Sequence, residues 1–489
     1  MAGSDCRYCR REQKRRCCSS GDLRHRTSIW RRRIHHADRI SALPDDLLLE
    51  VLVRLRCAAA AARTSLLGRR WRGLWTRLPE LSFHAAAPDP LDAGVAQADL
   101  LRPRSSTPPS LLAVHQTCPH AAVVAAGVSS WLRAAARLAP AELLISVRNC
   151  RSFGDVIKLP CLDRTISMEL HVDGDRVAVP PAGEFRALEN LTLSYCDVDL
   201  GDLLPRCPRL RRLEIRGGCY LEAITVHSPS LEELILSPSV PIGHVVDIVA
   251  PGLKKLKYAS SSVCPSALKY SGPLLEELDW QCTCQSSTGQ FGVRWWLYNM
   301  KLACKREEKA SLQLNNNHPR VHTMSMLLGV YKRSYGLEEY ELGHEMSLVT
   351  PFTKFQILEL SILTFGHVYG AMVLHLLGLC TFIKKLRVDL REERKTCPAD
   401  CSCHQPTNWG NITISLTHLT EVDIHGLKGD DHEVEFLKVI FRSAPALERM
   451  AVYLACNVSP SNKGCMEIYS ISKVYPSVKC NIYHQPDDE

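Results

Sequence analysis

Five segments with one apolar pattern occupy the middle of the chain: LENLTL (188–193), LRRLEI (210–215), LEELIL (231–236), LKKLKY (253–258) and LEELDW (275–280). Their starts lie 22, 21, 22 and 22 residues apart. In each segment the last two apolar positions are two residues apart, so both would point to the same face of a short strand. One such unit cannot bury its apolar face alone. The pattern therefore predicts a stack of repeats that share one core and one parallel sheet.

This period is typical of leucine-rich repeats, which have about 20–29 residues per unit. Weaker copies precede the five segments at Ile145 and Leu170, and a looser series follows at Val321, Phe355, Ile383, Leu419 and Leu447. We expect leucine-rich repeats over residues 128–395, joined by turns that contain Pro and Ser. The expected fold class is α/β: a small three-helix domain followed by a curved solenoid with a short parallel sheet.

The same register predicts which charged residues face outward from the repeats. They are Arg212, Glu214, Glu233, Lys255, Lys257, Glu277 and Asp279. The sign of the charge changes from strand to strand, which indicates attraction between neighbouring strands that stabilises the register of the stack. A second interpretation is that this row of residues binds a protein target. The two interpretations are compatible, and the sequence leaves both open.

Asp38–Phe83 is a short segment with strong helical signals. Pro44 stands at a first helical position, and Asp45 and Asp46 follow in the first turn, where the helix dipole favours negative charge. Apolar residues then recur at helical spacing as Leu47, Leu48, Val51, Leu52 and Leu55. Three helices in so few residues are too small to form a self-sufficient core. Part of this apolar surface is therefore expected to contact a partner.

This segment, taken as residues 38–84, resembles the F-box of large plant families. The resemblance rests on Leu43-Pro44, the apolar stripe, the segment 69–72 and Trp75. It implies binding to a Skp-like adaptor, which bridges to a cullin-based ubiquitin ligase. The residues that it places in the adaptor contact are Leu43, Pro44, Leu47, Leu48, Val51, Leu52, Trp71 and Trp75. Gly68 departs from the family, which usually carries Ser there, and a glycine inside a helix would cost about 1 kcal/mol.

Residues 396–480 resemble the FBD-type region found beside leucine-rich repeats in plant F-box proteins. The matching features are Cys397-Pro398, Trp409, the strand pattern of 414–422, the helix pattern of 431–441 and the segment 442–450. The resemblance implies a cap for the last repeat, which would otherwise expose apolar surface.

Two groups of cysteines contain residue types that can bind a metal ion. Cys397, Cys401, Cys403 and His404 can meet one ion only if their loop folds tightly. Cys6 and Cys9, with Cys17-Cys18 and His25, lack the spacing of a second ligand pair. Ordinary thiols are the interpretation that we adopt for both groups, so no metal and no cofactor is assigned.

The positive charge of the chain is concentrated at its beginning. Residues 1–37 form a basic segment whose net charge equals the +8 of the whole chain. We expect a disordered arm, either a nuclear-import signal or solvated charge. The remainder is balanced, so nucleic-acid binding by the body of the protein has no electrostatic support. Residues 85–127, rich in Ala and Pro, are expected to be a linker, and residues 481–489 a tail.

The sequence also limits the classes of function. It has no run of eighteen apolar residues, and its 22 scattered cysteines are those of an intracellular protein of the cytoplasm or nucleus. It has no nucleophile elbow, phosphate loop or HExxH motif, so an enzyme is not expected. The expected function is a substrate-recognition subunit of a Skp-cullin-F-box ubiquitin ligase. The alternative is a scaffold whose basic arm binds nucleic acid or an anionic surface, with a degenerate F-box.

Overall fold

The computed structural model describes residues 40, 43–85, 94–95, 98, 107–117, 124–148, 156–173, 176–217, 223–238, 245–263, 267–272, 275–285, 294–306, 320–331, 352, 354–391, 397, 401, 409–456, 458–459 and 462–484. The chain divides into two units, Met1–Pro44 and Asp45–Glu489. Most of the first unit, including the basic arm, lies outside the described residues. All helices and strands below belong to the second unit, and no helix among the described residues is both long and apolar enough to cross a membrane.

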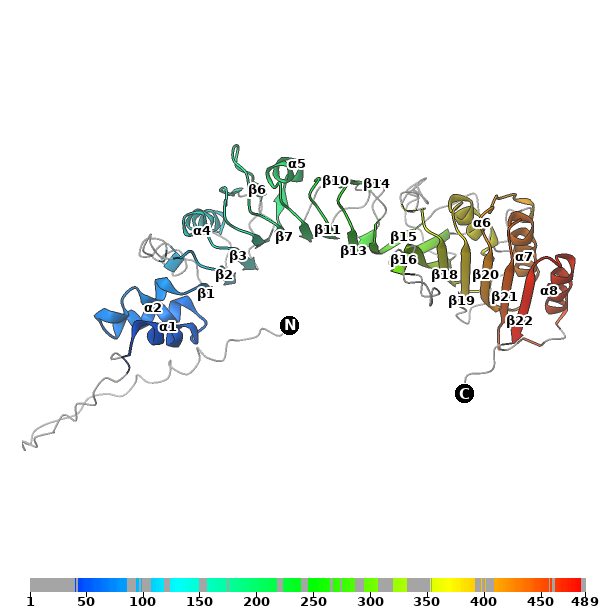
Figure 1. Cartoon of the computed structure of the whole chain (residues 1–489), viewed down its shortest axis with the longest axis horizontal. Helices are drawn as coiled ribbons and strands as arrows, with labels where there is room; N and C mark the ends of the chain where they lie inside the picture. The colour runs from blue at the N-terminus through cyan, green and yellow to red at the C-terminus, as the bar shows by residue number, and fades with distance from the viewer. Residues whose placement is uncertain are drawn as a thin grey trace, which may run out of the picture. The chain divides into compact units, whose positions relative to one another are not determined.

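One 16-stranded sheet dominates the second unit (Figure 1), which is therefore a mixed α/β structure consistent with leucine-rich repeats. In spatial order its strands are β1 (Glu80–Ala85), β2 (Leu111–Thr117), β3 (Glu142–Arg148), β5 (Ser167–Val172), β7 (Asn190–Ser194), β9 (Arg212–Arg216), β11 (Glu233–Ser237), β13 (Lys255–Val263), β15 (Glu277–Gln285), β16 (Arg294–Arg306), β17 (Arg320–Tyr331), β18 (Ile357–Leu363), β19 (Lys385–Arg391), β20 (Glu421–Leu427), β21 (Arg449–Leu454) and β22 (Lys479–His484). Neighbours are parallel, except that β16 is antiparallel to both β15 and β17.

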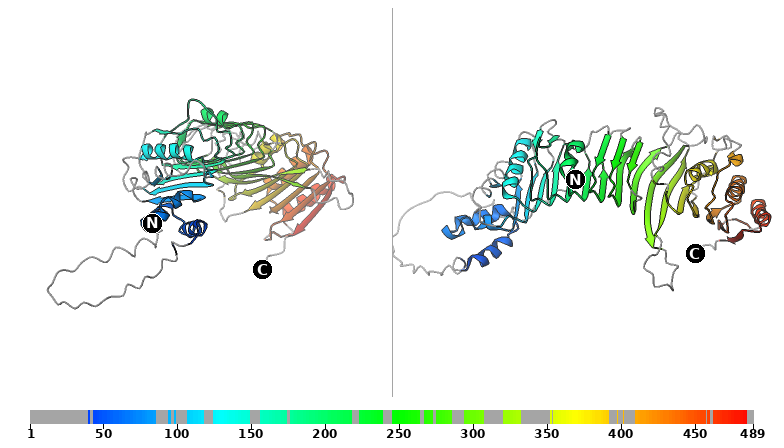
Figure 2. Two further views of the ribbon diagram at one scale, coloured as in Figure 1. Left: turned by 60° about the vertical axis from the view of Figure 1, so that its left-hand side comes forward. Right: turned by 45° about the horizontal axis from the view of Figure 1, so that its top comes forward.

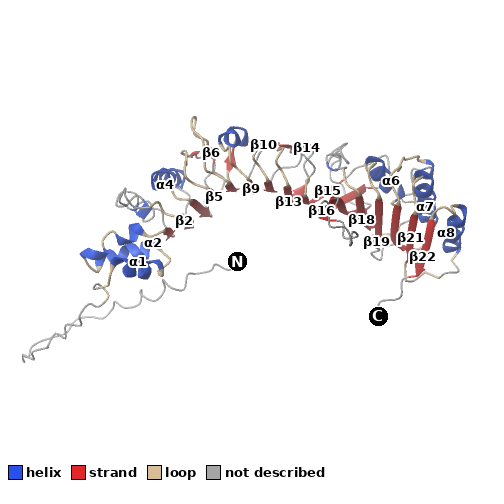
Figure 3. Cartoon of the chain, in the orientation of Figure 1, coloured by secondary structure: helices blue, strands red, loops and turns tan. Residues whose placement is uncertain are grey.

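Two small parallel sheets and several helices complete the second unit (Figure 2). The small sheets are β4 (Val156–Lys158), β6 (Arg176–Ala178) and β8 (Asp197–Val198), and β10 (Ala223–His227), β12 (Val245–Val249) and β14 (Ala267–Ser271). The α-helices are α1 (Asp45–Val53), α2 (Ala58–Arg63), α4 (Val124–Leu138), α5 (Leu200–Leu203), α6 (Gly370–Leu379), α7 (Asp431–Ser443) and α8 (Lys463–Val474). Helices α6, α7 and α8 lie on the same face of strands β18 to β22 (Figure 3).

The central repeats have the register that the sequence predicts. Leu213 of β9 lies opposite Leu234 of β11, which lies opposite Leu256 of β13 and then Leu278 of β15. All four side chains are buried. The next inward row is equally buried and ends in a stacked pair, Tyr258 and Trp280, whose ring centroids are 4.2 Å apart. Shared rows of this kind are what hold one repeat on the next.

Several strands lie where the sequence predicts no strand, among them two strands of the large sheet that differ most from expectation. The first is β2, which lies within the segment 85–127 that we expected to be a linker and pairs with β1 and β3. Its core, Leu112 to Val114, is fully buried, and a run this short beside Pro108-Pro109 gives no repeat signal. The second is β16, whose buried residues Leu297, Met300 and Leu302 do not follow the repeat pattern.

The segment 64–77 differs from the expected third helix. It consists of three short 3-10 turns, η1 (Thr64–Leu66), η2 (Arg69–Trp71) and η3 (Leu74–Arg77), which are separated at Gly68 and Gly73. Gly68 is extended, with a φ of 175°, so the helix penalty predicted for this glycine is wrong. Gly73 has a φ of 80°, a left-handed conformation that favours glycine and ends the preceding turn.

Candidate functional site

The apolar stripe of α1 divides into an inward and an outward face. Leu48 and Leu52 are 0% and 1% exposed, whereas Leu47 and Val51 are 43% and 36% exposed. Each pair is four residues apart, which places its members on one side of a helix. Helix α1 packs against η3. The inward face is therefore buried by this chain itself, without a partner. The outward face is available to a partner.

Other predicted contact residues also divide between core and surface. Trp71 and Trp75 are buried, and the Trp75 ring packs edge-on against Phe83 of β1. Leu43 is half-buried and Pro44 is exposed. Trp71 and Trp75 therefore hold the local structure together, while Pro44, like Leu47 and Val51, presents apolar surface to solvent.

The two most exposed leucines of residues 38–84 are not among the contact residues predicted from the sequence. Leu66 and Leu67 are 88% and 70% exposed, and Val53 and Leu55 are also exposed. Burying an apolar side chain that is now in water is favourable by about 25 cal/mol per Å². The sequence provided only a weak indication that Leu66 and Leu67 are exposed. The pair directly precedes Gly68, and the apolar residues around it do not recur at helical spacing.

Asp45 connects the start of α1 to the 3-10 turns. Its carboxylate accepts hydrogen bonds from Arg70 Nη2 at 2.9 Å and Nε at 3.1 Å, and Arg77 Nη1 lies 3.5 Å from its other oxygen. Asp45 was predicted only as a favourable charge at the helix N-terminus. The two arginines come from the basic part of the expected third helix, so these ion pairs replace helical continuity in holding that segment to α1.

The charges predicted to face outward from the central repeats pair both across and along strands, and Glu214 among them is buried. Arg212 lies 3.0 Å from Glu233 and 3.4 Å from Glu214, and Lys255 lies 3.0 Å from Glu277. The Asp279 carboxylate accepts a hydrogen bond from Gln281, and Lys257 is exposed. This pairing supports the interpretation that these charges stabilise strand register. Target binding by the same residues stays a prediction.

A denser charged and aromatic face lies on β18 to β22. Glu359 pairs with Arg387 at 2.9 Å, and Lys385 pairs with Glu421 and Asp423 at 3.0 and 3.1 Å. One step along the same strands, three rings stack in register: His425, Tyr453 and Tyr483, with centroid distances of 4.0 and 4.9 Å. Sequence reasoning noted the cations of this face but missed the rings, because each lies in a different repeat.

The N-terminus of α7 holds a buried carboxylate. Glu433 Oε2 accepts hydrogen bonds from the backbone N–H groups of Lys428, Gly429 and Asp430. Burial raises the pKa of the Glu433 carboxyl to about 7, although these three hydrogen bonds act in the opposite direction. Glu433 lines a cavity together with His367, Tyr369, Asp430 and His432. Its hydrogen bonds identify Glu433 as a helix cap rather than a reactive group.

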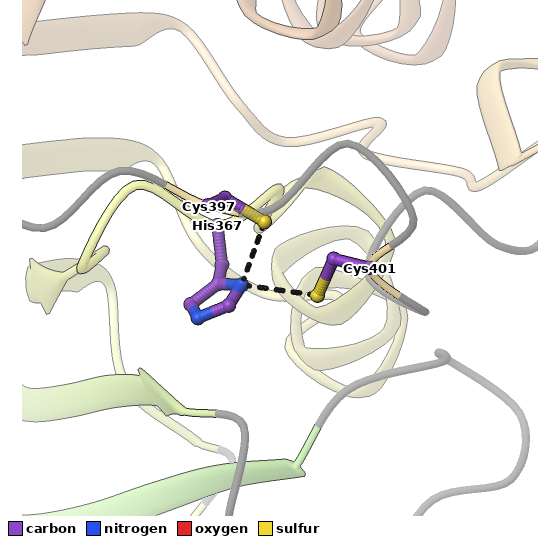
Figure 4. Close-up of side chains that lie close together, drawn as sticks. All are labelled: His367, Cys397 and Cys401. Atoms are coloured by element: carbon purple, nitrogen blue, oxygen red, sulfur yellow. Dashed lines mark hydrogen bonds between the residues drawn. The ribbon is translucent and has the colours of Figure 1, made fainter.

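A second buried cluster combines one histidine with two cysteines (Figure 4). His367 Nδ1 lies 3.2 Å from Cys397 Sγ and 3.4 Å from Cys401 Sγ. The sequence singled out the two cysteines but not His367, which is 30 residues from Cys397. Cys403 and His404, like Cys6, Cys9, Cys17, Cys18 and His25, lie outside the described residues.

Comparison with known proteins identifies relatives of one kind. An F-box/LRR-repeat protein of Arabidopsis thaliana is 28% identical over 251 residues, which cover 49% of this chain and 81% of that protein. An F-box/FBD/LRR-repeat protein of the same plant is 31% identical over 219 residues, which cover 42% of this chain and only half of that protein. A further F-box/FBD/LRR-repeat protein of Arabidopsis is 24% identical over 462 residues, covering 85% of this chain and 89% of that protein.

No protein-family model matches the chain, and no solved structure matches it significantly. The longest of these three alignments covers 85% of this chain. The resemblance predicted from the sequence is therefore confirmed: this chain is similar to plant F-box proteins that combine leucine-rich repeats with an FBD region.

Proposed function

We propose that this chain is the non-catalytic substrate-recognition subunit of a Skp-cullin-F-box ubiquitin ligase, acting in the cytoplasm or nucleus. Residues 38–84 serve as the F-box that binds a Skp-like adaptor and, through it, a cullin. The large sheet is the inner layer of a curved leucine-rich-repeat solenoid that binds a protein target. The alternative, in which the basic arm binds nucleic acid or an anionic surface, rests on residues 1–37, which lie outside the described residues.

The observation that carries this proposal is a set of exposed apolar side chains between residues 47 and 67. Leu47, Val51, Leu66 and Leu67 are all at least 36% exposed although the segment has its own buried core. Large exposed apolar patches on soluble proteins often mark sites of association. We assign the adaptor contact to these residues with Leu43 and Pro44, and a supporting role to Leu48, Leu52, Trp71 and Trp75.

Co-purification with a Skp-like adaptor tests the proposal. The full chain and the adaptor are expressed together, and the complex is isolated through a tag on the adaptor. The double variant Leu47→Asp/Val51→Asp is expected to reduce recovery at least tenfold, because it places two charges in an apolar contact. Val156→Asp is the matched control, since Val156 is an exposed valine (47%) of β4 outside this segment.

Three outcomes are informative. Recovery of wild type and of the Val156 control, with loss of the double variant, supports the proposal. Failure of wild-type chain to bind any Skp-like adaptor at micromolar concentration contradicts it. Equal recovery of the double variant would move the contact away from α1.

A further inference from the structure

The cluster of His367, Cys397 and Cys401 consists of the two side-chain types that zinc prefers. Thiolate sulfur and imidazole nitrogen are its usual ligands in proteins. In a tetrahedral site with Zn–S near 2.3 Å and Zn–N near 2.0 Å, a sulfur and a nitrogen ligand lie about 3.6 Å apart. The two S···N distances here are 3.2 and 3.4 Å, and all three atoms lie within 4.8 Å of one another. The ligand atoms are thus already nearly at coordination spacing.

The topology of the sheet explains how these residues meet. His367 follows β18 by four residues, and Cys397 follows β19 by six. Strands β18 and β19 are parallel neighbours, with Leu363 opposite Arg391, so their carboxyl ends lie at the same edge of the sheet. His367 comes after one of these strands and both cysteines come after the other, and their side chains meet beyond this edge.

The backbone before His367 is held in an unusual turn. Thr364 donates its N–H to the carbonyl of Arg391, and His367 donates its N–H to the carbonyl of Thr364. Between them, Phe365 has a φ of 46° and Gly366 a φ of 78°. A left-handed conformation at a phenylalanine is strained, and such strain gathers at functional sites. This turn directs the imidazole toward the cysteine connection (Figure 4).

The cysteine connection is held at its far end as well. Trp409 packs so closely on the start of α6 that a Cβ at Gly370 would lie 2.5 Å from its ring. The carbonyl of Gly410 accepts a hydrogen bond from Arg442 of α7. Trp409 and Gly410, the first described residues after Cys401, are therefore fixed against α6 and α7. Cys401 and His367 are 3% and 8% exposed, and Cys397 is half-buried, so the cluster is largely shielded from water.

We propose that His367, Cys397 and Cys401 bind one zinc ion that links the connections following β18 and β19. The ion takes the Nδ1 atom of His367 and the Sγ atoms of both cysteines. Each thiol releases its proton on binding, so one Zn²⁺ displaces two H⁺ and the net charge of the bound ion and thiolates is zero. The fourth position of the tetrahedron accepts water or a further ligand. This inference does not depend on the proposed function.

Zinc itself is the probe in the first experiment. The full chain is purified under reducing conditions, incubated with zinc, desalted and analysed for metal by mass spectrometry. Wild type is expected to retain about one zinc per chain through this site. Cys401→Ser and His367→Ala are each expected to weaken binding at least tenfold, while Cys480→Ser, a half-buried cysteine of β22, binds as wild type does. Circular dichroism of each variant shows whether it is folded.

A second measurement needs no variant. Zinc-loaded and chelator-treated wild type are labelled with a thiol reagent, and the labelled cysteines are identified by mass spectrometry. Zinc is expected to protect Cys397 and Cys401 but not the exposed Cys456. Cobalt in place of zinc is expected to give thiolate charge-transfer absorption and the visible bands of a tetrahedral site. Absence of bound metal in wild type, or protection confined to other cysteines, would overturn the proposal.

Discussion

Asp45 Oδ1 lies 2.9 Å from Nη2 of Arg70, 25 residues further along the chain. This contact fastens the first turn of α1 to η2, and Arg77 of η3 reaches the other carboxylate oxygen. Asp45, Arg70 and Arg77 therefore link α1, η2 and η3, three short segments that are separate along the chain. The same first turn leads into the buried residues Leu48 and Leu52 of α1, which packs against η3.

Asp45→Asn is expected to loosen α1. Exposed ion pairs are worth about 0.2–1 kcal/mol, so hydrogen exchange of the α1 amides should quicken by up to about fivefold. The difference should shrink at high salt, where half-exposed charges are screened. Glu50→Gln serves as control, because Glu50 and Arg54 are 3.9 Å apart and largely exposed. Equal effects of both substitutions would contradict a special role for Asp45.

Leu48→Ala and Leu47→Ala should separate stability from binding. The first removes a fully buried side chain and is expected to cost about 2–5 kcal/mol, whereas the second should cost less than about 0.5 kcal/mol. Limited proteolysis of the segment 45–77 reports the stability, and adaptor pull-down reports binding. We expect Leu47→Ala to resist proteolysis like wild type but to bind the adaptor more weakly. Rapid cleavage of Leu47→Ala would show that Leu47 belongs to the core.

The two glycines between the 3-10 turns should differ in how well they tolerate a side chain. A Cβ at Gly68 would meet its nearest neighbour, Trp71, at 3.9 Å, an ordinary contact on an extended backbone. Gly68→Ser is therefore expected to leave both thermal stability and adaptor binding unchanged. Gly73→Ala should cost about 1–2 kcal/mol, because its backbone is left-handed. Thermal unfolding followed by tryptophan fluorescence compares them, and a similar loss for both variants would contradict these backbone conformations.

Glu433 should make stability fall as pH rises. Burial raises the pKa of its carboxyl from 4.5 to about 7, so the folded protein binds this proton more tightly than the unfolded chain does. Its contribution to the free energy of unfolding is therefore fully present below about pH 4.5 and is lost as pH rises through about 7. Glu433→Gln, which cannot ionise, is expected to lose roughly 1–3 kcal/mol less than wild type between pH 4.5 and 8.

The pH profile of the variant is compared with that of wild type, because His367, His432, Asp430 and Tyr369 line the same cavity in both proteins. Thermal unfolding at successive pH values measures each profile. Glu448→Gln, an exposed carboxyl near β21, is the control and should follow wild type. Parallel profiles for wild type and Glu433→Gln would show that this carboxyl stays ionised when the protein is folded.

The central repeats could be predicted because their signal is local and repeated. Strands β7, β9, β11, β13 and β15 each carry two inward apolar residues, and these pairs recur every 21 or 22 residues, so the shared rows follow from that period. Strands β2 and β16 lie outside this series of repeats, so their places in the sheet depend on pairing with neighbours. Pairing is a property of the folded chain, which a search along the sequence cannot see.

The candidate sites show the same division. The stripe of α1 was predictable from helical period, but period alone does not say which half faces the core. That choice depends on the packing of α1 against η3, which lies more than 20 residues further along the chain. His367 was not predictable as a neighbour of Cys397, because only the adjacency of two parallel strands brings the two residues together.

The antiparallel strand β16 has a consequence for every later part of the chain. The chain reverses direction between β15 and β16 and again between β16 and β17, so β17 runs in the same direction as β15. A single apolar row crosses β16 intact, from Leu278 through Leu302 and Met324 to Leu358. Strand β16 therefore adds about 4.8 Å to the width of the sheet. Strands β18 and β19 still run in the same direction as the strands of the earlier repeats. Without the second reversal, β18 and β19 would run the other way, and His367 and Cys397 would lie at the opposite edge of the sheet.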